Sequence, residues 1–110
     1  MFVAKQYEDA NGSSPFLQWF DSLNAAAAAK VTTAVVRMEQ GNFSNVKPVG
    51  AGLSENKINF GPGYPVYFAK EGDQVILLLG GGSKKRQHRD IELAIDRWQD
   101  YKRRKRIGEE

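Results

Sequence analysis

The run Val75–Leu79 is apolar at every position and is followed directly by three glycines, Gly80–Gly82. A strand with one face in water alternates apolar and polar side chains, whereas an uninterrupted apolar run indicates a strand that is covered on both faces. The sequence therefore predicts a central strand at Val75–Leu79, in a sheet with other elements packed on both sides.

The other expected elements follow from periodicity and from turn residues. Ser14 and Pro15 are typical of a helix start, as an N-cap residue and a proline at the first helical position. We expect a strand at 2–7, helices at 16–23 and 25–38 that form an antiparallel hairpin, strands at 46–49, 53–60, 64–69 and 74–79, and a final helix with its apolar stripe at 91–101. The fold class is α+β, with an antiparallel twisted sheet. Residues 1–101 form a single domain, and the basic tail 102–110 is expected to fray.

Charge is distributed unevenly along the 110 residues. Residues 1–83 hold six Lys/Arg and seven Asp/Glu, whereas residues 84–106 hold ten Lys/Arg and four Asp/Glu. A concentrated positive field attracts polyanions, although a solvated basic helix would have the same composition.

Composition excludes several classes of site. The chain has no cysteine and one histidine, so thiol catalysis and cysteine-based zinc sites are excluded, and we expect no metal and no cofactor. No apolar stretch approaches the roughly 20 residues that span a membrane, and no signal peptide is recognisable. We expect a cytoplasmic protein that does not contact membranes.

Short motifs in a fixed order carry a resemblance to a known family. They are Phe16 and Trp19, Gly41-Asn42, Lys47–Gly50, Gly52–Glu55, Phe60–Tyr64, Val66–Phe68, Leu77–Gly81, Lys84, Gln87, Asp90-Ile91, Ala94 and Trp98. Over roughly residues 14–100 the chain resembles the RelE/ParE toxin superfamily, and in particular its HigB-like addiction module killer proteins.

The resemblance implies a toxin of a type II toxin–antitoxin system that cleaves mRNA on the ribosome as a metal-independent endoribonuclease. It also implies a cognate helix-turn-helix antitoxin as partner, and a toxin–antitoxin complex that binds its own promoter DNA. Two alternatives remain open: a non-nucleolytic toxin that targets DNA gyrase, and an inactive module that only binds its antitoxin.

The catalytic residues of this family are basic, and the matching positions here are Lys57 and Lys84, with Gln87 at a recurring polar position. Metal-free RNA cleavage needs a base near the 2′-hydroxyl, cations around the phosphate and a proton donor for the leaving oxygen. Further RNA contacts are expected from the adjacent residues Lys85, Arg86, His88 and Arg89.

Three departures from the family pattern affect this site. Most relatives have arginine where this chain has Pro65, an apolar residue and arginine at Asn56-Lys57, and aspartate at Ser83. Proline cannot replace a phosphate-binding arginine, and it should favour an edge or irregular strand position. Lysine keeps the charge of arginine but loses its bidentate geometry. The resemblance therefore implies an attenuated toxin.

Overall fold

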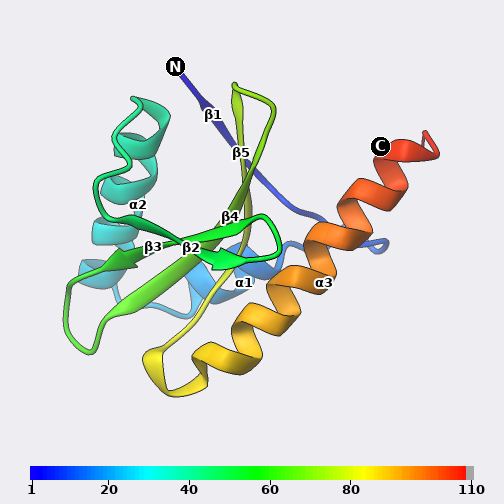
Figure 1. The fold of residues 1–110 in the computed structure, drawn as a ribbon. Coiled ribbons are helices and arrows are strands. Elements are labelled where there is room, and N and C mark those ends of the chain that lie inside the picture. Colours follow the sequence, from blue (N-terminus) through cyan, green and yellow to red (C-terminus); the bar gives the residue numbers. More distant parts are fainter. Residues whose placement is uncertain (109–110) are drawn as a thin grey trace.

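A computed structural model of the chain describes residues 1–108. It contains, in order, β1 (Val3–Gln6), α1 (Pro15–Asp21), α2 (Ala25–Glu39), β2 (Val46–Gly50), β3 (Leu53–Ile58), β4 (Tyr64–Glu71), β5 (Val75–Gly81), the 3₁₀ turn η1 (Lys84–Arg86) and α3 (Gln87–Arg106). The five strands form one sheet in the order β1-β5-β4-β3-β2 (Figure 1). The fold is α+β, as the sequence predicts.

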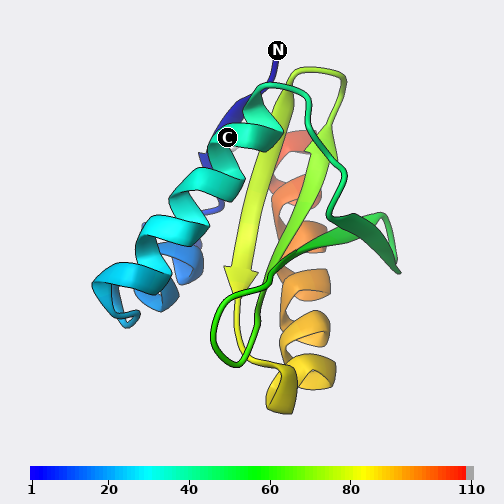
Figure 2. The same cartoon turned by 90° about the vertical axis from the view of Figure 1, so that its left-hand side faces the viewer.

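The sheet is covered on both faces. Figure 2 shows the strands between α2 on one side and α3 on the other. Side chains of α1 and α2 pack with one set of strand residues that includes Phe68, Ile76 and Leu78, while α3 packs against the opposite set that includes Leu77 and Leu79. β5 is an interior strand and its residues 76–80 are all buried. The prediction of a central strand covered on both faces is confirmed.

Both N-terminal helices begin at a capping side chain, and the first of them begins where Ser14 and Pro15 predict. Ser14 accepts a hydrogen bond from the Leu17 amide, and Pro15 is the first residue of α1. Asn24 accepts in the same way from the Ala27 amide at the start of α2. These side chains satisfy backbone donors that the first helical turn cannot pair internally. The two helix starts are thus fixed by local chemistry.

The expectation of an antiparallel sheet is wrong for one pair of strands. β2–β3, β3–β4 and β4–β5 are antiparallel, but β1 runs parallel to β5, with Val3 opposite Val75 and Gln6 opposite Leu78. The sheet is therefore mixed. Strand periodicity specifies which face a side chain occupies but not the direction of the partner strand, so the pattern at 2–7 could not reveal this pairing.

Of the two positions expected for Pro65, an edge strand and an irregular strand position, the structure excludes the first. β4 is interior, and Pro65 is its second residue, opposite Lys57 of β3. The Pro65 carbonyl accepts from the Gly82 amide, on the side of β5. Because the N and O atoms of a strand residue point to the same side, the missing N–H also faces β5, where the β4–β5 pairing ends at Val66 and Gly81. The proline costs no hydrogen bond to β3.

The expected frayed tail is helical over residues 102–106. α3 extends to Arg106. Ion pairs of Arg104 with Asp100 and of Lys105 with Glu71 stabilise its last turns. The Tyr101 hydroxyl adds a hydrogen bond of 2.7 Å to Glu71. Positive side chains near a helix C-terminus also interact favourably with the helix dipole. Residues 109–110 of the expected tail lie outside the described residues.

Replacing Leu77 by alanine is expected to lower the free energy of unfolding by about 2–5 kcal/mol, because Leu77 is fully buried at the centre of β5 and a cavity would remain. Urea unfolding followed by circular dichroism measures the change. Leu17→Ala is the matched control, since Leu17 is 41% exposed, and its cost should be about 1 kcal/mol or less. Equal costs at the two positions would contradict the described core.

Candidate functional site

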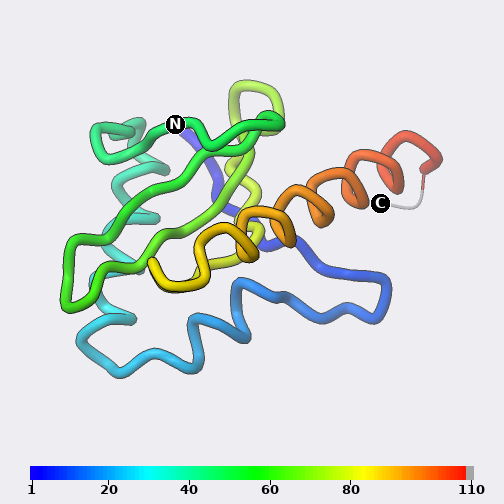
Figure 3. The backbone as a smooth tube through the Cα atoms, turned by 60° about the horizontal axis from the view of Figure 1, so that its bottom comes forward, coloured from blue at the N-terminus to red at the C-terminus, as the bar shows by residue number. Residues whose placement is uncertain are grey.

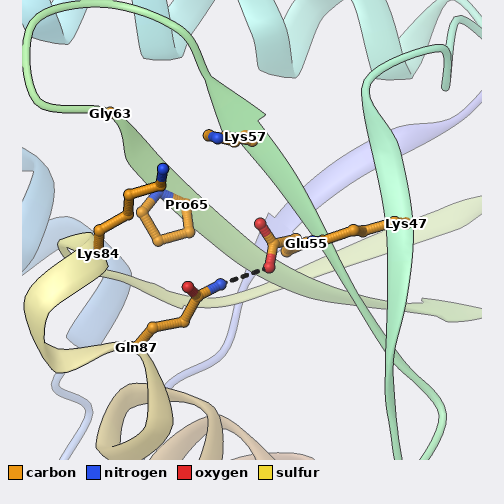
Figure 4. Close-up of a pocket in the computed structure, with 7 residues that line it drawn as sticks. All are labelled: Lys47, Glu55, Lys57, Gly63, Pro65, Lys84 and Gln87. Atoms are coloured by element: carbon orange, nitrogen blue, oxygen red, sulfur yellow. Dashed lines mark hydrogen bonds between the residues drawn. The ribbon is translucent and has the colours of Figure 1, made fainter.

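Three segments distant in sequence meet at one end of the sheet. They are the turn between β3 and β4, the glycines at the end of β5 and the start of α3, and they lie at the same end of the molecule in Figures 1 and 3. A pocket of about 50 Å³ opens between them. It is lined by Lys47, Glu55, Lys57, Gly63, Pro65, Lys84 and Gln87 (Figure 4).

Strand alternation and two glycines position these side chains. In β3, Leu53, Glu55 and Lys57 share one face of the strand, so a charged pair follows a core residue towards the strand end. At the end of β5 the backbone passes very close to other side chains. A Cβ atom on Gly81 would overlap the Trp19 ring, and one on Gly82 would overlap the Asp90 carboxylate. Glycine at both positions therefore allows the loop to hold Lys84 over the end of β3.

The amines of Lys57 and Lys84 lie near one another beside Pro65 (Figure 4). Lys84 lowers the pKa of Lys57, chiefly as a hydrogen-bond partner and next as a like charge. Partial desolvation and the charge of Lys47 lower this pKa further, while the Glu55 carboxylate raises it. The pocket therefore holds two neighbouring lysines, of which Lys57 releases its proton more readily than an ordinary lysine.

Lys84→Met is expected to raise the pKa of the Lys57 amine towards its ordinary value, because the substitution removes the largest cause of its depression. In the unmodified protein Lys57 then loses its proton at a lower pH than in the variant. The pH dependence of NMR chemical shifts in lysine-labelled protein measures the pKa of Lys57 in the unmodified protein and in the variant. Lys30→Met, on the exposed surface of α2, is the control and should leave Lys57 unchanged. An identical Lys57 titration in the Lys84→Met protein would contradict the proximity of the two amines.

The floor of the pocket is polar and buried. Glu55 is only 1% exposed, and its Oε1 accepts a hydrogen bond of 2.6 Å from Gln87 Nε2. Tyr67 lies opposite Glu55 in the β3–β4 register and is completely buried. Its hydroxyl has no hydrogen-bond partner within residues 1–108. Burial raises the pKa of Tyr67, and the nearby Glu55 and Asp90 carboxylates raise it further, so its hydroxyl keeps its proton.

The structure brings together the three residues that the sequence places in the catalytic set, namely Lys57, Lys84 and Gln87. The four expected RNA-contacting residues, Lys85, Arg86, His88 and Arg89, are exposed and do not line this pocket. The His88 side chain is 93% exposed and lies 3.5 Å from Glu92, its neighbour one turn along α3. His88 is therefore at the surface beside the pocket.

Sequence reasoning missed Lys47 and Glu55. The signal for Glu55 was present, because it alternates with Leu53 and Lys57 and so had to share their face of β3. Lys47 is exposed in the edge strand β2, where it is opposite Glu55 in the register. That pairing could not be read from the sequence.

Asn56 lies on the opposite face of β3, as its alternation with Ile58 predicts. It is 4% exposed, and its Oδ1 has no hydrogen-bond partner in the part of the chain that the structure describes. It borders a small polar hollow beside Arg37, Asn42, Ser44 and Asn45. This hollow is separate from the cationic pocket, because the sheet lies between them.

Two further properties concern metals and membranes. Across residues 1–108, no cluster of three or more His, Cys, Asp or Glu side chains is arranged to hold a metal ion. None of the helices described here combines the length and the apolar character that a membrane crossing requires.

The sequence is similar to that of a Haemophilus influenzae protein described only as uncharacterized. The two are 38% identical over 80 residues, which cover 72% of this chain and 81% of the relative. The chain belongs to the same protein family as this relative. No family model matches the sequence.

Proposed function

We propose that this protein is a toxin of the RelE/ParE superfamily, of the HigB-like kind, and that it cleaves mRNA on the ribosome. The observation that carries the proposal is the convergence of Lys57, Lys84 and Gln87 in one pocket, where Lys84 lowers the pKa of Lys57. Several cations and a proton acceptor are what cleavage of a phosphodiester without a metal needs. The motifs of the sequence and the mixed α+β fold support the superfamily assignment.

In the proposed reaction the neutral amine of Lys57 takes the proton of the ribose 2′-hydroxyl. The 2′-oxygen forms a bond to phosphorus, and the bond from phosphorus to the 5′-oxygen breaks. The Lys84 ammonium gives its proton to the leaving 5′-oxygen. The products are a 2′,3′-cyclic phosphate and a 5′-hydroxyl, and the two lysines exchange roles as proton holders. Lys47 adds positive charge near the phosphate.

The basic surface around the pocket is also the proposed contact with a cognate helix-turn-helix antitoxin. Covering the lysines with an acidic or helical segment would exclude RNA from the pocket. The proposed complex binds its own promoter DNA, and the protein acts in the cytoplasm. RNA affinity should be lower for the complex than for the free protein, and equal affinities would count against this mode of neutralisation.

A second function is favoured by one observation, the presence of Pro65 in the wall between the two lysines. An inactive module that binds antitoxin would keep the fold and tolerate the missing arginine. Inducing the gene in cells and mapping mRNA 5′ ends distinguishes the two. Cuts at codon positions support the nuclease. A DNA-damage response without cuts would indicate gyrase, and no effect on growth would indicate the inactive module.

A further inference from the structure

Glu55 determines which end of the Gln87 amide faces a ligand. An ionised carboxylate can only accept hydrogen bonds, so the group that lies 2.6 Å from Glu55 Oε1 must be the amide nitrogen. The carbonyl oxygen Oε1 is consequently turned the other way. In Figure 4 it lies on the side of Lys84, towards the interior of the pocket.

The orientation is held by buried structure. Glu55 is fixed in β3 and is 1% exposed, so water does not compete effectively for its hydrogen bond to Gln87. Gln87 is the first residue of α3, and the close approach of Gly82 to Asp90 seats this helix start against the end of β5. The pocket therefore presents a fixed hydrogen-bond acceptor beside two cationic amines.

The same floor holds a polar group that the protein does not pair. The Tyr67 hydroxyl is completely buried next to Glu55, and within residues 1–108 it has no hydrogen-bond partner. Burial of such a group costs free energy, which proteins generally avoid outside functional sites. This hydroxyl lies beside Glu55 in the sheet, next to the residues that line the pocket, so the polar character of the site extends into the protein interior.

We propose that Gln87, oriented by Glu55, accepts a hydrogen bond from the 2′-hydroxyl of a ribose next to the one that Lys57 deprotonates, and makes the pocket selective for RNA over DNA. The lysines bind phosphate, which both nucleic acids carry, so they cannot distinguish the two. The 2′-hydroxyl is the group that separates RNA from DNA, and at the 2′ position only ribose has a donor for the Gln87 carbonyl. Gln87 contacts the substrate, and Glu55 acts through it as a positioning residue.

This inference rests on the proposed function only in assuming that a nucleic acid occupies the pocket, and it is tested by binding without any cleavage. The probes are single-stranded uridine hexanucleotides with fluorescent labels, carrying ribose, 2′-deoxyribose or 2′-fluororibose. Fluorine can accept but not donate a hydrogen bond. Fluorescence anisotropy at low salt gives Kd for each probe, and gel electrophoresis confirms that the RNA stays intact.

One neutral hydrogen bond corresponds to roughly a 2- to 12-fold difference in affinity. The ribose probe should bind the unmodified protein tighter than the deoxy and fluoro probes by about this factor. Gln87→Leu should lower the affinity for the ribose probe to that for the deoxy probe, and it should leave the affinity for the deoxy probe unchanged. Gln99→Leu, at an exposed position of the same helix, is the matched control and should keep the full preference.

Glu55→Gln tests the positioning role. A glutamine at this position can present either its oxygen or its nitrogen, so the Gln87 amide is no longer forced into one orientation, and the RNA preference should fall. Equal Kd values for ribose and deoxy probes in the unmodified protein, or an intact preference in Gln87→Leu, would overturn the inference. Selective RNA binding without cleavage in cells would instead remove the nuclease proposal alone. Absence of binding to any probe would remove both.

Discussion

Lys84→Ala is expected to reduce mRNA cleavage by a factor on the order of 10²–10³, the usual effect of removing one donor from a transition-state anion. The substitution removes the proposed proton donor to the leaving 5′-oxygen. It also removes the hydrogen bond and the charge by which Lys84 lowers the pKa of Lys57, so that pKa rises towards its ordinary value. Less of the Lys57 amine is then neutral at physiological pH. Both consequences slow the reaction.

The measurement is growth arrest together with primer extension on mRNA at matched expression. Lys84 is exposed, so the folded fraction should not change, and circular dichroism checks this. Lys30→Ala removes an equal charge from the exposed surface of α2 and should leave cleavage unaltered. Lys57→Ala should reduce cleavage similarly. Undiminished cleavage by the Lys84 variant would place the chemistry elsewhere.

The fold could be predicted where local chemistry decides the structure. The apolar run Val75–Leu79 specified a strand with two covered faces, and Ser14 with Pro15 specified a helix start. Partner choice is not local, so the parallel pairing of β1 with β5 was missed. The length of α3 was underestimated for a related reason, because contacts to Glu71, distant in sequence, stabilise residues that look like a basic tail.

The site was predictable for a different reason. Lys57, Lys84 and Gln87 were selected by resemblance, and the structure supplies their convergence. What resemblance did not provide is the role of Glu55. From the sequence alone, Glu55 cannot be distinguished from an ordinary charged residue at the surface. Only burial and the hydrogen bond to Gln87 show that it organises the pocket floor.

Pro65 connects the fold to the expected strength of the activity. Its side chain is fully buried in the pocket wall between Lys57 and Lys84, and its position in β4 costs no pairing with β3. The fold therefore tolerates the proline. The cations that line the pocket, however, are all lysines, and no lysine can offer a phosphate the paired donors of a guanidinium.

Pro65→Arg is accordingly expected to raise cleavage by a factor on the order of 10²–10³, because a positioned guanidinium adds charge-assisted hydrogen bonds to the transition-state phosphate. The residue alternates with Tyr67 on the face of β4 that carries the pocket, so the new side chain starts within it. Growth arrest and primer extension measure the gain, and thermal unfolding checks that the larger residue is accommodated.

The matched control is Pro48→Arg, which adds the same charge at an exposed position of the edge strand β2 that does not line the pocket. If the gain depends on a guanidinium within reach of the phosphate, Pro48→Arg should change cleavage little, since an exposed charge is screened by water and salt. Equal gains from both variants would mean that only net charge matters. If a folded Pro65→Arg protein is neither more toxic nor more active, then the proline does not limit catalysis, and the arginine is dispensable or the target is not RNA.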